Sequence, residues 1–337
     1  MNHIDRQLKE IAGDFDPEQK PPGIEPVPAG TPRPLWSVMI PTFNCAKYLE
    51  KTLQSVLSQD PGIKKMQIQV VDDCSTQDDP EEVTRRIGKG RVLFSRNSEN
   101  TGSCSKNFNI CIEKSFGKLI HILHGDDFVL PGFYEKIQDL VKENPDVSFF
   151  STRCFFVDEQ GILNSVSARV KSLEKPSKNN EEFFYTTAVQ ASGVVVRRSF
   201  YEENGGFLTN LVHTADNELY ARAIAMSAGV VSKEVMASYR VFSANDTSKL
   251  VKTGKNIIDI YRLNKIFSKK YPSFSKKKGL ERAVLLALSQ TLFFKKEKNR
   301  DAYIKNKAIY YLIAPLGFRF KQKIKKILNS AKKLLNV

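Results

Sequence analysis

The chain has 337 residues, 41% of them apolar and 26% charged, which is ordinary for a globular protein with one large domain and an appendage. Its five cysteines are odd in number and form no Cys-x-x-Cys pair, which argues against a zinc site or a disulfide framework and fits a reducing cytoplasm. The polar first twenty residues predict no secretory signal. The longest apolar runs, 283–294 and 308–318, are too short for a membrane span of roughly 20 residues.

The net charge of +15 is concentrated at one end of the chain. Residues 251–337 contain 23 Lys and Arg against 4 Asp and Glu, whereas residues 1–250 contain 29 against 33. A nucleic-acid enzyme more often carries positive charge around its site, so nucleic acid is not an expected partner. A basic tail on a near-neutral body indicates an anionic surface outside the site.

Along the first half of the chain, strands and helices are expected to alternate. Seven prolines between residues 16 and 34 exclude a helix and predict an extended arm, so residues 1–35 are assigned to a Pro-rich arm. The apolar spacing predicts strands over 36–40, 67–71, 91–95 and 118–123, and helices over 47–59, after residue 78 and over 107–114. This alternation predicts an α/β fold with a doubly wound, mostly parallel sheet.

The second half is expected to complete this domain and then become helical. Further elements are predicted as a helix over 133–143, a strand over 147–157, a loop to 180, a strand over 189–197, a helix over 215–228 and a strand over 229–240. A loop over 241–248 is expected to close over a bound ligand. The main domain is placed at 36–250 and a basic α-helical extension at 251–337, whose last stretch, 320–337, has an apolar face opposite lysines. That pattern fits either a helix on an anionic membrane surface or a helix packed on the domain.

Two of the expected strands end in adjacent carboxylates. Asp72 and Asp73 follow the second strand, and Asp126 and Asp127 follow the fourth. Ligands of open α/β sheets bind beyond the carboxyl ends of the strands. Paired acids there can hold a hard divalent cation, which in turn can hold phosphate oxygens. The sequence therefore predicts a nucleotide-diphosphate site that uses Mn²⁺ or Mg²⁺.

Four segments carry a resemblance to a known family: Ser37–Asn44, Val71–Thr76, Asn100–Gly102 and Gly125–Asp127. In this order they resemble the motifs of family 2 glycosyltransferases, over residues 36–248. The resemblance implies an inverting enzyme of the GT-A fold that transfers a sugar from a nucleotide-sugar donor to an acceptor hydroxyl. A UDP-sugar is favoured, because acids after the second strand suit uracil.

The resemblance and the basic tail also suggest a biological setting. They imply bacterial polysaccharide, O-antigen or capsule assembly, with a glycan or lipid-linked glycan as acceptor. The tail then predicts a peripheral position on the inner face of the cell membrane, where anionic lipid attracts basic residues.

The resemblance assigns donor contacts to residues that follow the first, second and fourth expected strands, to residues just before the helix 107–114, and to the last residue of the strand 229–240. They are Pro41, Thr42, Phe43, Asp72, Asp73, Asn100, Gly102, Lys106, His124, Gly125, Asp126 and Arg240. Phe43 is expected to stack on the base, unless it is a core aromatic. Asp73 is the favoured acceptor of a base N–H, and Asp72 then caps the following turn. Lys106, where the family often has Arg, faces phosphate or is a solvated helix lysine.

Asp126 and Asp127 are the expected metal ligands. The family's usual Asp-x-Asp-Asp run begins here with His124 in place of the leading Asp. This histidine can bond the ribose, add a nitrogen ligand that favours Mn²⁺, or line the pocket without a metal bond.

The catalytic base is expected later in the chain. Asp216 matches the family's base, which takes the proton of the acceptor hydroxyl; Ala215 replaces the acid that usually precedes it. A helix N-cap is the competing role for Asp216, and Glu218 is expected to be a surface or capping acid. Acceptor-side contacts are expected from Ser192, Gly193 and Arg222.

Two other classes of function fit parts of the pattern. A nucleotidyltransferase usually has a Gly-rich basic loop after the first strand, which residues 41–45 are not. A non-catalytic nucleotide- or membrane-binding relative is suggested by the acids missing at positions 124 and 215. The presence of both Asp126 and Asp216 argues against it.

Overall fold

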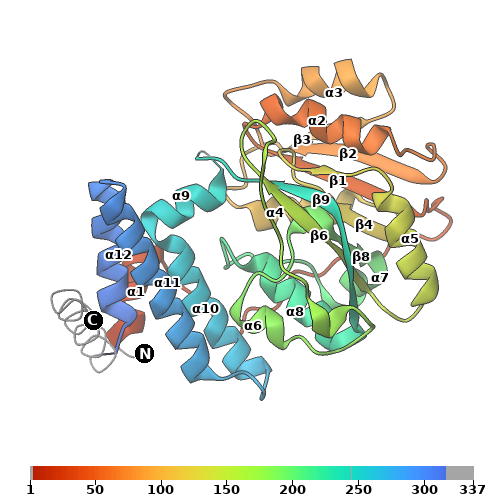
Figure 1. The fold of residues 1–337 in the computed structure, drawn as a ribbon. Coiled ribbons are helices and arrows are strands. Elements are labelled where there is room, and N and C mark those ends of the chain that lie inside the picture. Colours follow the sequence, from red (N-terminus) through yellow and green to blue (C-terminus); the bar gives the residue numbers. More distant parts are fainter. Residues whose placement is uncertain (1–2, 244, 316–337) are drawn as a thin grey trace, which may run out of the picture. The chain divides into compact units, whose positions relative to one another are not determined.

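The computed structural model describes residues 3–243 and 245–315, which form two compact units (Figure 1). The sheet unit contains residues 16–245, and the helical unit combines residues 3–15 with the chain from residue 246 on. This division differs from the expected domains at both ends. Residues His3–Ala12, within the range 1–35 assigned to the arm, form helix α1, and Leu8 packs into the core of the helical unit.

The sheet unit is built on one nine-stranded sheet in the order β3-β2-β1-β4-β8-β6-β9-β5, with β7 paired to β6. The strands are β1 Trp36–Thr42, β2 Met66–Asp72, β3 Leu93–Arg96, β4 Leu119–Ile122, β5 Phe128–Val129, β6 Phe149–Val157, β7 Leu163–Val166, β8 Val194–Arg197 and β9 Gly229–Arg240. The α-helices of this unit are α2 Ala46–Leu57, α3 Pro80–Gly88, α4 Cys104–Lys114, α5 Phe133–Glu143, α6 Glu181–Tyr185, α7 Arg198–Asn204 and α8 Ala215–Ser227. The mixed α/β architecture confirms the predicted fold class.

Strands β3, β2, β1 and β4 are parallel neighbours, and all residues of β1, β2 and β4 are buried. Apolar runs of this kind are typical of parallel strands covered on both faces. The chain crosses from β1 to β2 on one side and returns to β4 on the other side of β1. The carboxyl ends of β1 and β4 therefore flank a topological switch point, where open α/β sheets bind ligands.

Beyond β4 the sheet is mixed. Strand β8 is antiparallel to β4 and to β6, whereas β9 is parallel to β6. The predicted strand 189–197 is shorter than expected, because Ala191–Gly193 form a 3₁₀ turn. The expected loop before residue 180 contains β7, since Asp158 accepts hydrogen bonds from the backbone N–H groups of Gln160 and Ile162 and closes a hairpin turn.

The helical unit contains α1, α9 Asp246–Thr253, α10 Lys255–Lys270, α11 Lys276–Lys296 and α12 Arg300–Ile313. Leu8, Ile257, Val284 and Ile309 are among its buried core residues. Helix α9 starts within the expected loop 241–248, with Asp246 in its first turn, where a negative charge is favoured by the helix dipole. None of the helices described is both long and apolar enough to cross a membrane. The amphipathic stretch 320–337 lies outside the described residues.

Candidate active site

The loop after β2 is organised by Asp72. This carboxylate is fully buried and accepts hydrogen bonds from the backbone N–H and the hydroxyl of Ser75, the latter at 2.5 Å. It also pairs with Arg96, whose Nε lies 2.6 Å from Oδ2. The predicted turn-capping role of Asp72 is confirmed, and its donor contact stays a prediction.

Asp73 holds the next loop along the sheet edge. Its carboxylate accepts the hydroxyl of Thr101 at 2.8 Å, the backbone N–H of Thr101 at 3.0 Å and the side-chain amide of Asn97 at 2.8 Å. Asn100 donates to the backbone oxygen of Asp73 at 2.7 Å and accepts the N–H of Gly102, which has a φ of +66°. The structure thus joins the predicted residues of two motifs, and the base contact of Asp73 stays a prediction.

Two predicted donor residues present their side chains to solvent at this edge. Phe43, just after β1, is 42% exposed, which excludes the alternative of a core aromatic. Lys106 is exposed in the first turn of α4, near the helix end that attracts anions. Both side chains are available to a ligand.

The loop after β4 is seated tightly against the end of β1. Gly125 donates its N–H to the backbone oxygen of Pro41, and a Cβ at this glycine would lie 2.7 Å from the methyl group of Thr42 and 3.0 Å from the sulfur of Cys45. A side chain at position 125 would push the loop away from β1. Gly125 therefore fixes the depth at which the following acids stand.

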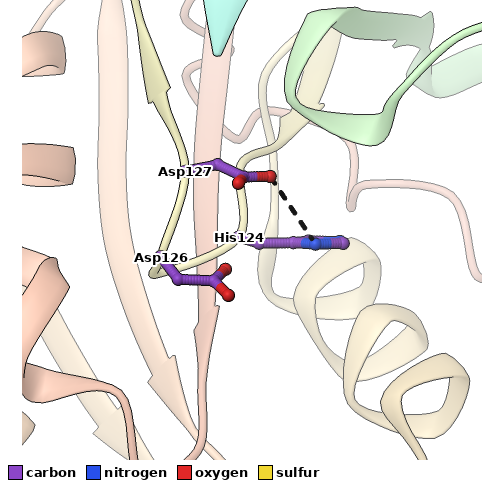
Figure 2. A group of neighbouring side chains, drawn as sticks. All are labelled: His124, Asp126 and Asp127. Carbon is purple, nitrogen blue, oxygen red and sulfur yellow. Dashed lines mark ion pairs between the residues drawn. The ribbon is translucent and has the colours of Figure 1, made fainter. Parts of the chain in front are cut away.

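His124, Asp126 and Asp127 form a cluster on this loop (Figure 2). Each offers one ligand atom, and these atoms all lie within 4.8 Å of one another. The Nδ1 atom of His124 is 4.0 Å from Oδ2 of Asp127. Two carboxylates and an imidazole are a donor set for a divalent cation, and the imidazole suits Mn²⁺ better than Mg²⁺.

The surroundings of Asp127 would favour a bound cation. One carboxylate oxygen, Oδ1, accepts the backbone N–H of Arg240 at 2.8 Å, while Oδ2 is buried and has no hydrogen-bond partner among the described residues. Burial, and next the charge of Asp126, raise the pKa of Asp127 well above its usual value. A bound cation would satisfy Oδ2 and offset both effects, so these residues fit the expected metal.

Arg240 ends β9 and anchors this loop. Its Nε donates to the backbone oxygen of Asp126 at 2.9 Å, and one terminal nitrogen donates to the backbone oxygens of Asp158 and Glu159 at 3.2 and 2.8 Å. The guanidinium also stacks on the ring of Tyr48, 4.8 Å from its centroid. The side chain of Arg240 thus holds the acidic loop, and its expected contact with the donor stays a prediction.

Tyr48 and Glu159 also belong to this region, although the sequence around them predicts no role there. The carboxylate of Glu159 accepts the hydroxyl of Tyr48 at 2.9 Å and the ammonium of Lys47 at 2.7 Å, which ties the β6–β7 turn to the start of α2. Burial, with the hydrogen bond to Glu159, raises the pKa of Tyr48 to about 12. No local signal identifies these residues, because Tyr48 and Glu159 are far apart in the chain.

Packing against α4 links the acidic loop to the segment that precedes α8. The ring of Phe108, in α4, stacks on His124 at 5.0 Å and contacts Phe207 edge-on at 5.3 Å. The thiol of Cys104 lies 3.9 Å from the backbone oxygen of Val212. Asp216 follows in the first turn of α8, partly exposed, and accepts the N–H of Asn217 at 2.7 Å.

Glu218 and Arg222 form a buried ion pair, which corrects two expectations. Glu218 is fully buried and lies 3.1 Å from the guanidinium of Arg222, so it is neither a surface acid nor a cap. Arg222 also donates to the backbone oxygens of Asn204 and Gly206, both at 2.7 Å. Because all these partners are internal, Arg222 supports the fold instead of reaching toward an acceptor.

Ser192 and Gly193 also differ from the expected acceptor contacts. Ser192 is fully buried; its hydroxyl faces the sulfur of Cys154, and its backbone oxygen lies 3.1 Å from Nε2 of His121. A Cβ at Gly193 would lie 2.9 Å from the backbone oxygen of Thr152. Their small side chains serve close packing around β6.

Known proteins resemble this chain in sequence. An uncharacterized protein of Mycobacterium tuberculosis is 28% identical over 245 residues, covering 68% of this chain and 75% of the relative. The poly(ribitol-phosphate) beta-N-acetylglucosaminyltransferase TarS of Staphylococcus aureus is 22% identical over 198 residues, covering 58% of this chain and 33% of TarS.

Solved structures share the fold. Residues 1–349 of S. aureus TarS, in complex with UDP-GlcNAc, match with a TM-score of 0.51 and 17% identity, covering 82% of this chain and 91% of that one. The mannosyltransferase PcManGT of Pyrobaculum calidifontis, in complex with GDP-Man and Mn²⁺, matches with a TM-score of 0.53 and 18% identity, covering 96% and 86%. Both are glycosyltransferases, and the GT-A fold expected from the sequence is confirmed.

The family model named Glycosyl transferase family 2 matches residues 37–205. This range contains the loops after β1, β2 and β4 and the cluster of His124, Asp126 and Asp127. The chain belongs to glycosyl transferase family 2 and is a glycosyltransferase.

Proposed function

We propose that this glycosyltransferase inverts the anomeric centre as it moves a sugar from a nucleoside-diphosphate donor, with UDP-sugars favoured, to an acceptor hydroxyl. The observation that carries the proposal is the buried Oδ2 of Asp127 at the switch point of the sheet, which has no hydrogen-bond partner among the described residues. Solved neighbours bind UDP-GlcNAc in one case and GDP-Man with Mn²⁺ in the other. They support a nucleotide-sugar donor for this chain.

Asp126 and Asp127, with His124 beside them, would hold a divalent cation. When bound, the cation would neutralise the charge that develops on the diphosphate as it leaves. The remaining donor contacts come from the neighbouring loops. Phe43 would stack on the base, Asp73 would accept a base N–H, and the exposed Lys106 would face the phosphates.

Asp216 is the proposed catalytic base. In a single displacement, the acceptor oxygen attacks the anomeric carbon, Asp216 takes the proton of that hydroxyl, and the bond to the diphosphate breaks. The contacts of α4 with residues 207 and 212 support this role, because they bring the chain just before α8 next to the start of α4, where Lys106 lies.

The proposed setting is surface-glycan assembly at the cytoplasmic face of the membrane. TarS, a relative over 58% of this chain, is named for transfer to poly(ribitol-phosphate), which supports a polymer or glycan acceptor. The excess of basic residues after residue 250 supports a peripheral position on anionic lipid.

The test combines donor binding with one substitution. Calorimetry with UDP, GDP, dTDP and CDP, each with Mn²⁺, Mg²⁺ or EDTA, should give metal-dependent binding of one nucleotide. The Asp216→Asn enzyme should bind that nucleotide normally but transfer its sugar at least about 100-fold more slowly, because an amide cannot take the proton. The amide oxygen can still accept the N–H of Asn217, so the helix start is preserved.

Glu218→Gln is the matched control on the same helix. It should reduce stability, because the buried partner Arg222 loses its counter-charge. The rate of sugar transfer per folded molecule should remain unchanged. Equal losses of donor binding and transfer in Asp216→Asn would contradict the catalytic role. Absence of nucleotide binding under all conditions would contradict the proposed function itself.

A further inference from the structure

Helix α11 exposes an apolar face that the described residues do not cover. Its inner side packs in the core through residues such as Ala283, Val284 and Ala287. The opposite side exposes four large apolar side chains, which we call the α11 face: Leu285 (48% exposed), Leu286 (38%), Leu292 (55%) and Phe293 (55%). Residues that are seven positions apart are separated by about two helical turns and lie on the same side of a helix. Leu285 and Leu292 are such a pair, as are Leu286 and Phe293, so the four form one stripe. Exposed apolar stripes of this kind mark contact surfaces.

Basic residues frame the α11 face at both ends. The exposed cations before it are Lys276, Lys277, Lys278 and Arg282, and those after it are Lys295 and Lys296. Glu281 is the one acid in the helix. Helix α12, which packs against α11, exposes Ile304 (52%) and Tyr311 (49%), again seven positions apart. The apolar stripe therefore lies between clusters of positive charge.

Three candidates could cover the α11 face: a second copy of the chain, residues 316–337 or a lipid surface. Their charges show which of them is complementary to it. The described residues of the helical unit contain 19 Lys and Arg against 8 Asp and Glu, so a second copy would bring the same basic rim to the face. Residues 316–337 contain seven Lys and Arg and no acid, so this segment would also meet like charge there. An anionic lipid surface complements both the cations and the apolar stripe.

We propose that the α11 face is a membrane-contact surface for anionic lipid. Leu285, Leu292 and Phe293 enter the boundary between headgroups and acyl chains, and the flanking lysines meet lipid phosphates. The surface narrows the proposed peripheral location, which was argued from the overall charge of residues 251–337, to one folded helix. Its test needs no sugar transfer, so its failure and the failure of the proposed function can be told apart.

Vesicle flotation of the full-length protein tests the proposal. The protein should bind vesicles of phosphatidylcholine with about 30 mol% phosphatidylglycerol far better than pure phosphatidylcholine vesicles, and about 0.5 M NaCl should weaken the binding. The Leu292→Gln/Phe293→Gln protein should bind the anionic vesicles at least about tenfold more weakly, because the apolar contribution is lost. Both side chains are more than half exposed, so the fold should persist, as thermal unfolding will show.

Ile162→Gln/Leu163→Gln is the matched control, since these apolar side chains are 64% and 56% exposed in the sheet unit. This protein should bind vesicles like the unchanged chain. Equal binding by the α11 variant and the control would overturn the proposal and leave the stretch 320–337 as the expected lipid anchor. A change from dimer to monomer in the α11 variant without lipid would also overturn it, because a second copy would then cover the face.

A depth measurement gives an independent answer. In the Phe293→Trp protein, vesicles with brominated acyl chains should quench the fluorescence of the introduced tryptophan. In the Ile162→Trp protein, the same vesicles should leave the fluorescence of the introduced tryptophan unchanged. The one native tryptophan, Trp36, is buried and gives a constant background. Equal quenching at the two positions, or none at position 293 in bound protein, would contradict insertion of the α11 face.

Discussion

Asp127 carries a buried carboxylate whose ionised form is unfavourable in the free protein. Its Oδ2 is buried without a hydrogen-bond partner among the described residues, next to the charge of Asp126. A buried anion in this position is unfavourable in the free protein. The sequence alone identifies the two acids, but burial distinguishes them: Asp126 is partly exposed, whereas Asp127 is 1% exposed.

Asp127→Asn should therefore stabilise the metal-free protein. The folded-state pKa of Asp127 is raised above its unfolded value, so stability is lost as the pH rises from the usual carboxyl pKa through the raised one, and the neutral amide removes this cost. In EDTA near pH 7, the free energy of unfolding should rise by more than the roughly 0.5 kcal/mol spread of neutral substitutions. Thermal unfolding checks this; a lower midpoint for the variant would contradict it.

The same variant tests the metal site. Mn²⁺ should raise the unfolding midpoint of the unchanged protein, since a ligand that binds only the folded state stabilises it. Asp127→Asn should show little of this effect. An equal Mn²⁺ effect in both proteins would place the cation elsewhere.

At the scale of elements, Arg240 joins three segments that are distant in sequence. From the end of β9 it holds the loop after β4 through Asp126 and the β6–β7 turn through Asp158 and Glu159. Tyr48, at the start of α2, stacks on the same guanidinium. The acidic loop is thus positioned by an element that comes more than 100 residues later.

Arg240→Lys should loosen this loop and weaken Mn²⁺ binding by about tenfold or more, which is the usual effect of losing a group that orients metal ligands. A lysine keeps the charge and the backbone N–H to Asp127, but its single nitrogen does not reproduce the planar fork through which Nε and a terminal nitrogen reach separate carbonyl oxygens. Calorimetric titration with Mn²⁺ measures the effect. Tyr48→Phe, which keeps the ring under Arg240, should retain normal affinity; an unchanged affinity in Arg240→Lys would contradict the positioning role.

At the scale of the whole sheet unit, one buried histidine links folding to pH. His121 donates from Nε2 to the backbone oxygen of Ser192 at 3.1 Å and accepts at Nδ1 from the hydroxyl of Tyr134 at 3.2 Å. Burial is the main cause that lowers the pKa of His121 to about 3. Because the unfolded chain titrates near pH 6.5, the unfolded state binds more protons between these values, and stability falls as the pH falls below about 6.5.

We expect the sheet unit to lose about 2 kcal/mol between about pH 6.5 and pH 5 through His121, at about 1.4 kcal/mol per pH unit. Urea unfolding followed by the fluorescence of Trp36 reports on this unit, since Trp36 is the one tryptophan and packs 5.1 Å from Tyr134. His121→Gln can make both hydrogen bonds without a titrating group and should show a shallower pH dependence. Identical pH profiles would rule out this linkage.

The sequence by itself determined the features that depend on local order. Buried apolar runs and the acids that follow them fixed the parallel strands and their carboxyl ends, because strand period and turn chemistry act over a few residues. The same local motifs were sufficient to identify the family and the cluster of Asp126 and Asp127, which the structure brings together with His124.

Only the tertiary structure decided which polar residues are internal. Glu218 and Arg222 are buried partners and Ser192 packs in the core, contrary to their expected positions. Arg240 holds the acidic loop, a role that its place in the sequence does not indicate. Nothing in a neighbouring stretch of sequence reports burial or a hydrogen bond to a distant carbonyl group, since both arise when separate elements pack together. For the same reason, the exposed apolar side of α11 became visible only after its buried side was known.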